Sequence, residues 1–170
     1  MKRIHIIGPV GCGKTTLARQ LGSMYKLPHY EIDNIVWERN ELGDRRRTVE
    51  ARDQLLQQVV QQDEWVLEGV HRFVEASLHK ADTIIWLDLS YHARVKAISI
   101  RYIKQVLHIE KSNYKPNLAL LRNMYRWNRQ YEQTDREKII DLLMPFEKKV
   151  IQVKTRVKLE DWGKCVNQDD

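Results

Sequence analysis

Cysteines and long apolar runs are scarce in this 170-residue chain, and their scarcity excludes several kinds of protein. The two cysteines, Cys12 and Cys165, lie near opposite ends, so we expect neither a disulfide framework nor a cysteine-based metal cluster. No apolar run approaches the roughly 20 residues that a membrane-spanning helix needs. A predicted strand begins within three residues of the N-terminus, which leaves no room for a signal peptide. We therefore expect a cytoplasmic protein that makes no contact with a membrane.

Repeats and low-complexity tracts are also absent, and no second domain is needed. The 42% of hydrophobic residues suffice for one sizeable core, so we expect a single domain over residues 1–170. The net charge of +6 arises in one segment, residues 101–130, which holds seven basic residues and one acid. These basic residues are Arg101, Lys104, Lys111, Lys115, Arg122, Arg126 and Arg129. Charges cancel in the rest of the chain, so this segment carries the whole imbalance.

The most informative stretch runs from Gly8 to Thr15 and reads GPVGCGKT. It fits G-x-x-x-x-G-K-[ST], the phosphate-binding loop. In this motif the glycines let backbone N–H groups turn around an anion, the lysine reaches the outer phosphates, and the hydroxyl ligates Mg²⁺. We therefore expect ATP and Mg²⁺ to bind at Gly8, Pro9, Val10, Gly11, Cys12, Gly13, Lys14, Thr15 and Thr16.

The residues on either side supply the structural context that this motif requires. The apolar run Arg3–Ile7 predicts a strand before the loop. Apolar side chains at helical spacing, Leu17, Leu21 and Met24, predict a helix after it. The alternative is a glycine-rich strand-to-helix turn that binds no ligand.

Two residues inside the loop modify its expected chemistry. Pro9 has no N–H, so we expect the amides from Gly11 onward to hold the phosphate. Cys12 fits either a small filler or an oxidisable thiol whose pKa is lowered by Lys14.

Four further short apolar runs predict strands, and predicted helices separate them. The expected strands span residues 27–33, 65–68, 83–88 and 149–154. The expected helices span 48–62 with Thr48 as N-cap, 91–107 with Ser90 as N-cap, a segment that ends near Tyr131, 135–144 and 159–166. This alternation predicts an α/β fold in which right-handed βαβ units form a parallel sheet covered on both faces.

Three acids, Asp33, Glu68 and Asp88, stand at the ends of predicted strands. In parallel sheets the ligand lies beyond the carboxyl ends of the strands, where the phosphate-binding loop also lies. A crevice with one lysine, one hydroxyl and three carboxylates is chemically a metal-phosphate site. For Asp88 the alternative is an acid that caps the next helix or holds the loop by hydrogen bonds.

The motifs GPVGCGKTTLARQLG, LPHYEID, WVLEGVHR and TIIWLDLS resemble the adenylate-kinase-like and shikimate-kinase-like branch of P-loop proteins. The resemblance is greatest to the bacterial DNA topology modulation proteins. It covers the motifs of the first half of the chain and only the layout of the second half. It implies a three-layer α/β/α P-loop fold with a five-stranded parallel sheet in the order 2-3-1-4-5 and a helical lid after the fourth strand.

The same resemblance implies roles for the loop and for the acids near it. Lys14 would neutralise the outer phosphates, and Thr15 would bind Mg²⁺ with help from Glu68 and Asp88. Residues 68–72 resemble an adenylate-kinase block in which an acid supports Mg²⁺ and an arginine holds the phosphate of the acceptor. Arg72 takes the place of that arginine.

The acceptor and the lid also have candidate residues by resemblance. Asp33 falls where shikimate-kinase-like members place an acid that binds the acceptor or takes its hydroxyl proton. Arg101 lies thirteen residues after Asp88, which matches the spacing of an arginine brought over the transferring phosphate, and Arg94 is a second candidate on the same helix. The implied function is a kinase that transfers the γ-phosphoryl group of ATP to a nucleotide or another small molecule, with the basic segment, about residues 101–135, as its lid.

A regulatory protein that binds ATP and associates with nucleic acid, with little or no kinase activity, is the alternative. Aromatic residues interleave with the bases of the basic segment and could stack on nucleobases. They are Tyr102, Tyr114, Tyr125, Trp127 and Tyr131. The same composition also suits a kinase lid or an amphipathic helix pair that faces the core.

Overall fold

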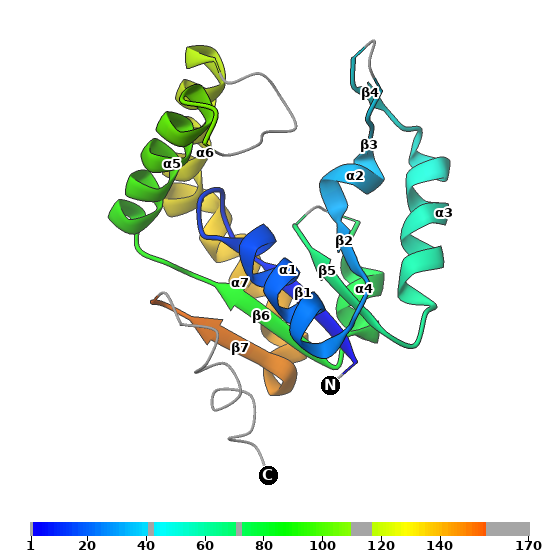
Figure 1. Ribbon diagram of the computed structural model, residues 1–170. Helices are drawn as coiled ribbons and strands as arrows, with labels where there is room; N and C mark the ends of the chain where they lie inside the picture. Colours follow the sequence, from blue (N-terminus) through cyan, green and yellow to red (C-terminus); the bar gives the residue numbers. More distant parts are fainter. Residues whose placement is uncertain (1, 41–42, 71–72, 110–116, 156–170) are drawn as a thin grey trace.

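The computed structural model describes residues 2–40, 43–70, 73–109 and 117–155, and a five-stranded parallel sheet runs through its centre (Figure 1). The strands are β1 (Arg3–Ile7), β2 (His29–Glu31), β5 (Trp65–Glu68), β6 (Thr83–Leu87) and β7 (Val150–Val153). They lie in the order β2-β5-β1-β6-β7, and every neighbouring pair is parallel. Numbered along the chain within this sheet, the order is 2-3-1-4-5, as the resemblance implied.

Helices connect the strands and cover both faces of the sheet (Figure 1). They are α1 (Lys14–Tyr25), α2 (Ile32–Val36), α3 (Val49–Val60), α4 (Glu75–Lys80), α5 (Tyr91–Val106), α6 (Leu118–Gln130) and α7 (Arg136–Leu143). A π-helical turn, Tyr131–Asp135, joins α6 to α7, and a 3₁₀ helix, Met144–Lys149, leads to β7. A small antiparallel pair, β3 (Trp37–Glu38) with β4 (Arg45–Arg46), was not predicted.

Side chains alternate between the two faces of each strand, and this alternation builds the three layers. On β1, Ile4 and Ile6 pack in a core with residues of α1. Ile7 faces the opposite side, in a core with residues of α3, α4 and α7. On β5, Val66 belongs to the α1 side, so Glu68, two residues later, also faces the α1 side.

Both helix caps predicted from the sequence are present. The Thr48 hydroxyl accepts the N–H of Ala51 at 3.3 Å at the start of α3. The Ser90 hydroxyl accepts the N–H of Ala93 at 3.4 Å at the start of α5. Each cap satisfies one of the amide donors that a helix start leaves without an intrahelical partner.

The second strand is shorter than predicted and ends at Glu31, so Asp33 lies in the first turn of α2 rather than at a strand end. The helix starts there because Ile32, Ile35 and Val36 have helical spacing and are buried in the core. Near Tyr131 the helix does not end as predicted but continues through the π-helical turn. The helix predicted over residues 159–166 lies outside the described residues.

Two parts of the molecule project beyond the carboxyl ends of the strands (Figure 1). One is the hairpin of α5 and α6, and the other consists of α2, β3 and β4. The loop between β1 and α1 lies between them. Among the described residues, no helix combines the length and the apolar composition needed to cross a membrane.

Candidate functional site

Three glycines shape the loop between β1 and α1. Their φ angles are +150° at Gly8, +77° at Gly11 and +96° at Gly13, a region that glycine adopts readily and other residues do not. A Cβ at Gly8 would lie 2.6 Å from the carbonyl oxygen of Leu87, and one at Gly11 would lie 2.7 Å from Cγ1 of Ile98. A Cβ at Gly13 would meet nothing within 4 Å. The loop is therefore packed against β6 and α5 on one side and open at Gly13, where α1 begins.

The open side of the loop presents the amino end of α1. The N-cap residue of this twelve-residue helix is Gly13, which has no side chain to cap it, so the first amides and the helix dipole can face an anion. The Lys14 ammonium donates to the carbonyl oxygen of Pro9 at 3.0 Å, which folds the lysine over the loop. Val10 is half-buried and Thr16 is exposed. This geometry fits the predicted phosphate-binding role of the loop.

Glu68 is brought to the loop, as the sequence predicted. The Thr15 hydroxyl donates to Oε1 of Glu68 at 2.5 Å, although 53 residues separate them. Glu68 is only 6% exposed, and burial raises the pKa of its carboxyl while Lys14 and Thr15 oppose that rise. A hydroxyl and a carboxylate beside a phosphate-binding loop are ligands that suit Mg²⁺.

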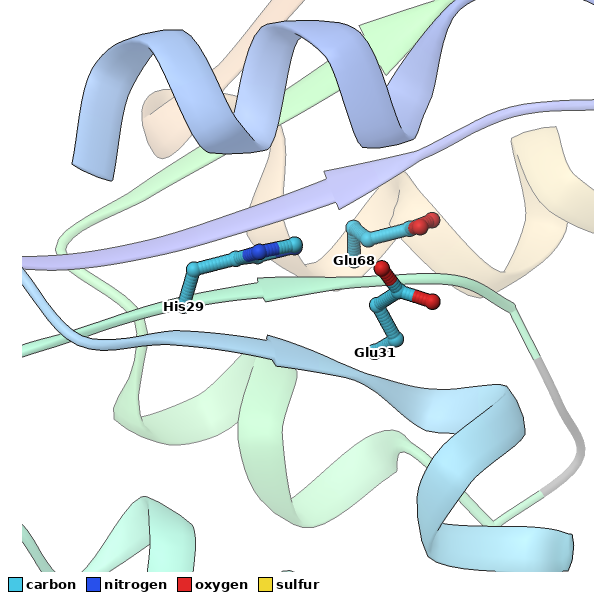
Figure 2. Close-up of side chains that lie close together, drawn as sticks. All are labelled: His29, Glu31 and Glu68. Carbon is cyan, nitrogen blue, oxygen red and sulfur yellow. The ribbon is translucent and has the colours of Figure 1, made fainter. Parts of the chain in front are cut away.

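Glu31 is a further carboxylate at this site that the sequence analysis missed. It ends β2 directly beside Glu68 in the sheet register, and the Arg19 guanidinium pairs with it at 3.1 Å. His29, two residues earlier, lies on the same face of β2, and Figure 2 shows its ring extending toward the two carboxylates. The period of two along a strand was the available signal, since it places His29 and Glu31 on one side once β2 pairs with β5.

The immediate surroundings of His29 and Asp33 differ. Burial lowers the pKa of the His29 imidazole, and its Nε2 is buried without a hydrogen-bond partner among the described residues. Asp33 is exposed on α2, and its charge contributes to the raised pKa of Glu68. The two acids Glu31 and Asp33 thus flank the end of β2, one in the sheet and one in the helix that follows.

Asp88 has partners that do not belong to the loop. Its carboxylate accepts hydrogen bonds from Arg136 at 2.8 Å, from Tyr131 at 2.9 Å and from Gln152 at 2.9 Å. Burial raises the pKa of Asp88, but the bonds from Arg136 and Tyr131 outweigh burial and leave that pKa lowered. The carboxylate therefore joins β6, α7 and β7, which favours the alternative in which Asp88 holds the structure by hydrogen bonds, and its place near Mg²⁺ stays a prediction.

The three predicted arginines have different surroundings. Arg94 is fully buried and donates to Asn128 at 2.6 Å, to the carbonyl oxygen of Leu89 at 2.7 Å and to Glu132. All three guanidinium nitrogens donate within the protein, and the side chain is inaccessible to solvent. The structure therefore corrects the predicted role of Arg94 in substrate binding. Arg101 is exposed on α5, and Arg72 lies outside the described residues.

Cys12 is a buried filler rather than a reactive thiol. A Cβ at Gly8 would lie 2.9 Å from its sulfur, so the thiol packs beneath the loop. Burial raises the pKa of Cys12, and the opposing effect of Lys14 is smaller. Of the two alternatives for this residue, the structure therefore supports the small filler.

Comparisons with known proteins bear on the fold more than on the activity. No protein-family model matches the chain. An alignment of 69 residues is 35% identical to the shikimate kinase of Legionella pneumophila and covers 34% of this chain. That alignment spans only 39% of the length of the Legionella enzyme.

Solved structures are similar over nearly the whole chain. The shikimate kinase from Acinetobacter baumannii in complex with shikimate has a TM-score of 0.56 and 15% identity over 99% of this chain and 92% of that one. The shikimate kinase from Bacteroides thetaiotaomicron has a TM-score of 0.53 and 16% identity over 98% and 97%. The chain therefore has the three-layer α/β/α fold of the shikimate-kinase-like P-loop proteins.

Proposed function

We propose that the protein is an ATP-dependent kinase that phosphorylates a small molecule. The observation that carries this proposal is the hydrogen bond between Thr15 and Glu68, which couples the phosphate-binding loop to a buried acid. A loop that only bound phosphate would need no carboxylate beside its hydroxyl. The fold shared with shikimate kinases supports the same conclusion.

In this proposal the loop holds the triphosphate of ATP. The amides of the loop and of the first turn of α1 surround the phosphates, and Lys14 leaves the carbonyl oxygen of Pro9 to reach the outer ones. Thr15 and Glu68 would hold Mg²⁺, the hydroxyl directly and the carboxylate directly or through water. When bound, Mg²⁺ would neutralise the negative charge on the phosphates during transfer of the γ-phosphoryl group.

The acceptor would bind beside α2. Asp33 is exposed there and close enough to influence Glu68, so it can accept a hydroxyl proton or orient the acceptor. Arg72, predicted to hold an acidic group of the acceptor, follows the same strand as Glu68. An acceptor with a hydroxyl and a carboxylate or phosphate group fits these two residues.

The helix α5 would form one wall of the closed site. Gly11 of the loop packs against Ile98 on α5, and Arg101 lies on the same face one turn further along that helix. In this proposal a closing movement of α5 would bring Arg101 over the loop. A guanidinium over the transferring phosphoryl group stabilises its spread negative charge.

A panel of acceptors tests this proposal. Purified protein is incubated with ATP, Mg²⁺ and, separately, shikimate, sugars and nucleoside monophosphates, and ADP formation and phosphorylated product are measured. We expect one acceptor class to raise ADP formation at least about tenfold over the acceptor-free rate.

Matched lysine variants control this assay. Lys14→Ala should abolish turnover, whereas Lys138→Ala, which removes an exposed lysine on α7, should not change it. ATP binding without turnover on any acceptor would contradict the proposal.

A second candidate function rests on the surface of α6. Arg122, Arg126 and Arg129 are exposed at helical spacing on α6, and Trp127 beside them is 46% exposed. Such a stripe can contact a nucleic acid backbone. The resemblance to topology modulation proteins rests on sequence motifs alone and stays a prediction. Binding titrations with duplex and single-stranded DNA at two salt concentrations test this second function. Binding through the basic side chains should weaken steeply as the salt concentration rises.

A further inference from the structure

We propose that His29, Glu31 and Glu68 form a binding site for a divalent transition-metal ion such as Zn²⁺, with a ligand set different from that of the Mg²⁺ site. Only Glu68 is common to the two. The proposal concerns a property of the folded chain without nucleotide, so it stands apart from the kinase activity proposed above.

The sheet register brings the three side chains together. His29 and Glu31 are two residues apart on β2, and β2 pairs with β5 so that Glu31 lies beside Glu68. One ligand atom from each residue lies within 4.8 Å of the others. Figure 2 shows the imidazole ring extending along the sheet toward the two carboxylates. An ion held by all three would draw these atoms closer together, since zinc ligands lie about 2.0 to 2.2 Å from the metal.

The His29 ring carries the second observation. Its Nε2 is inaccessible to solvent and has no hydrogen-bond partner among the described residues. Buried polar atoms in folded proteins nearly always have a partner, and a bound ion or water is one explanation of an exception. Trp65, Gln105 and Asn128 also have such atoms, but of the four only His29 is grouped with two carboxylates. The carboxylates of Glu31 and Glu68 are the acids grouped with this ring, so a cation bound between them and the ring would give the imidazole a partner.

The chemistry of the ligands selects the ion. One imidazole and two carboxylates are a common donor set for Zn²⁺, and water can complete a tetrahedral arrangement. Mg²⁺ prefers oxygen ligands in an octahedron and gains little from an imidazole. The site therefore discriminates between the two ions by the presence of His29.

The existing contacts of the two acids leave room for the ion. Arg19 pairs with Oε1 of Glu31, and the Asn34 amide donates to Oε2 at 3.4 Å. The Arg19 side chain is 65% exposed and the bond from Asn34 is long, so both side chains can turn away when a cation replaces them. Thr15 donates to Oε1 of Glu68 only. The second oxygen of Glu68 accepts no hydrogen bond from the described residues, so it can ligate an ion while Oε1 keeps its contact.

Sharing Glu68 gives the site a consequence for the phosphate-binding loop. A transition metal bound by Glu68 would compete with Mg²⁺ beside Thr15 for the same carboxylate. Zn²⁺ should therefore raise the Mg²⁺ concentration needed for ATP turnover. This consequence alone rests on the proposed function.

The test measures metal binding without nucleotide. Metal-free protein is titrated with Zn²⁺ by calorimetry, and Co²⁺ binding is followed by its visible absorption, which reports the coordination geometry of the bound ion. We expect one ion per chain at this site and an affinity that falls more than about tenfold in His29→Gln and in Glu31→Gln. His79→Gln is the matched control, because it removes an exposed histidine on α4 and should leave binding unchanged.

Thermal melts confirm that each variant is folded, and Glu31→Gln decides if His29→Gln does not fold. The proposal is overturned if the wild-type protein leaves Zn²⁺ and Co²⁺ unbound, or if a folded variant binds them as tightly as the wild type. Displacement of Zn²⁺ by an equal concentration of Mg²⁺ also overturns it. Failure of the kinase assay affects none of these outcomes, since no nucleotide is present.

Discussion

The Thr15 hydroxyl donates a 2.5 Å hydrogen bond to Glu68, and this bond ties the amino end of α1 to the carboxyl end of β5. Glu68 is 6% exposed, so its charge is balanced by Lys14 and Thr15 rather than by water. Burying a charge in this way costs free energy, and it positions a carboxylate where a metal-bound phosphate would need one.

Glu68→Gln should raise the unfolding free energy of the protein and weaken its proposed use of Mg²⁺. Burial raises the pKa of Glu68 above 4.5, so the folded chain at neutral pH holds a charge that folding disfavours. We expect the variant to be more stable than the wild type at pH 7. The difference should vanish as the pH falls below 4.5, where the carboxyl is protonated in both folded and unfolded chains. Urea unfolding at pH 7 and pH 4 measures this difference.

The same variant should need about tenfold more Mg²⁺ for half-maximal ATP turnover, because the amide is a poor substitute for a carboxylate near the ion. Glu64→Gln, at an exposed ion pair with Lys2, is the control for both measurements. An unchanged Mg²⁺ requirement in Glu68→Gln would remove Glu68 from the proposed site.

Gly11→Ala and Gly13→Ala should differ in their cost. At Gly11 the new methyl group would lie 2.7 Å from Ile98 and 3.0 Å from the carbonyl oxygen of Arg94, so α5 must move. We expect a loss of about 2 to 4 kcal/mol in unfolding free energy, from overpacking and backbone strain together. At Gly13 nothing lies within 4 Å, so strain alone should cost about 1 to 2 kcal/mol.

Gly43→Ala separates these two effects. Gly43 also has a positive φ, +122°, and a Cβ there would meet nothing within 4 Å. Its cost should match that of Gly13→Ala in chemical denaturation. Equal destabilisation by Gly11→Ala and Gly43→Ala would show that the loop does not pack against α5.

Asp88→Asn should destabilise the protein without changing its response to Mg²⁺. The carboxylate holds Arg136, Tyr131 and Gln152, and the amide leaves Arg136 without its charge partner. Because Arg136 is 39% exposed, we expect a modest loss of about 1 to 2 kcal/mol at pH 7.

The pH dependence of this loss identifies its origin. The pKa of Asp88 is lowered in the folded chain. The stability that the carboxylate adds to the fold is therefore complete above pH 3.8 and disappears as the pH falls through the folded pKa. The gap between wild type and Asp88→Asn should therefore close below pH 3.8. A raised Mg²⁺ requirement in this variant would instead return Asp88 to the metal site.

His5 should make the protein sensitive to mild acid. It is fully buried on β1, its Nε2 donates to the carbonyl oxygen of Gly69 at 3.0 Å, and burial lowers its pKa from 6.5 to about 4. The His5 imidazole is thus protonated at a lower pH in the folded chain than in the unfolded chain. The free energy of unfolding is unaffected by His5 above pH 6.5, and protonation of His5 should lower it by up to about 3 kcal/mol as the pH drops to 4.

Denaturant unfolding across this pH range measures the loss, and His5→Gln should show a smaller one. A direct titration of the His5 imidazole by NMR provides a measurement that does not depend on the variant folding. Titration of His5 near pH 6.5 would contradict the prediction.

Local patterns were enough to predict much of this molecule. The loop from Gly8 to Thr15, the strands around it and the caps at Thr48 and Ser90 depend on neighbours a few residues apart. The alternation of strands and helices predicted the layers of the sheet. The boundary of β2 was wrong because the burial of Ile32, a tertiary contact, starts a helix where the local pattern continues a strand.

Polar side chains near strand ends could not be assigned in this way. Asp88 and Glu68 look alike in the sequence, each an acid after an apolar run. Glu68 faces α1 and meets Thr15, whereas Asp88 is held by residues from α7 and β7. Likewise Arg94 and Arg101 share a helix, and only packing against α6 decides that the first is buried.

The motif G-x-x-x-x-G-K-[ST] is a local requirement of backbone shape, so the residues alone predicted a phosphate-binding loop in an α/β sheet. Long-range packing selects which acids lie beside that loop. Whether a carboxylate meets Thr15 depends on strand register and on the partners that compete for its charge, and these come from residues more than forty positions away. Glu31 and His29 join Glu68 for the same reason, since the pairing of β2 with β5 is a long-range contact.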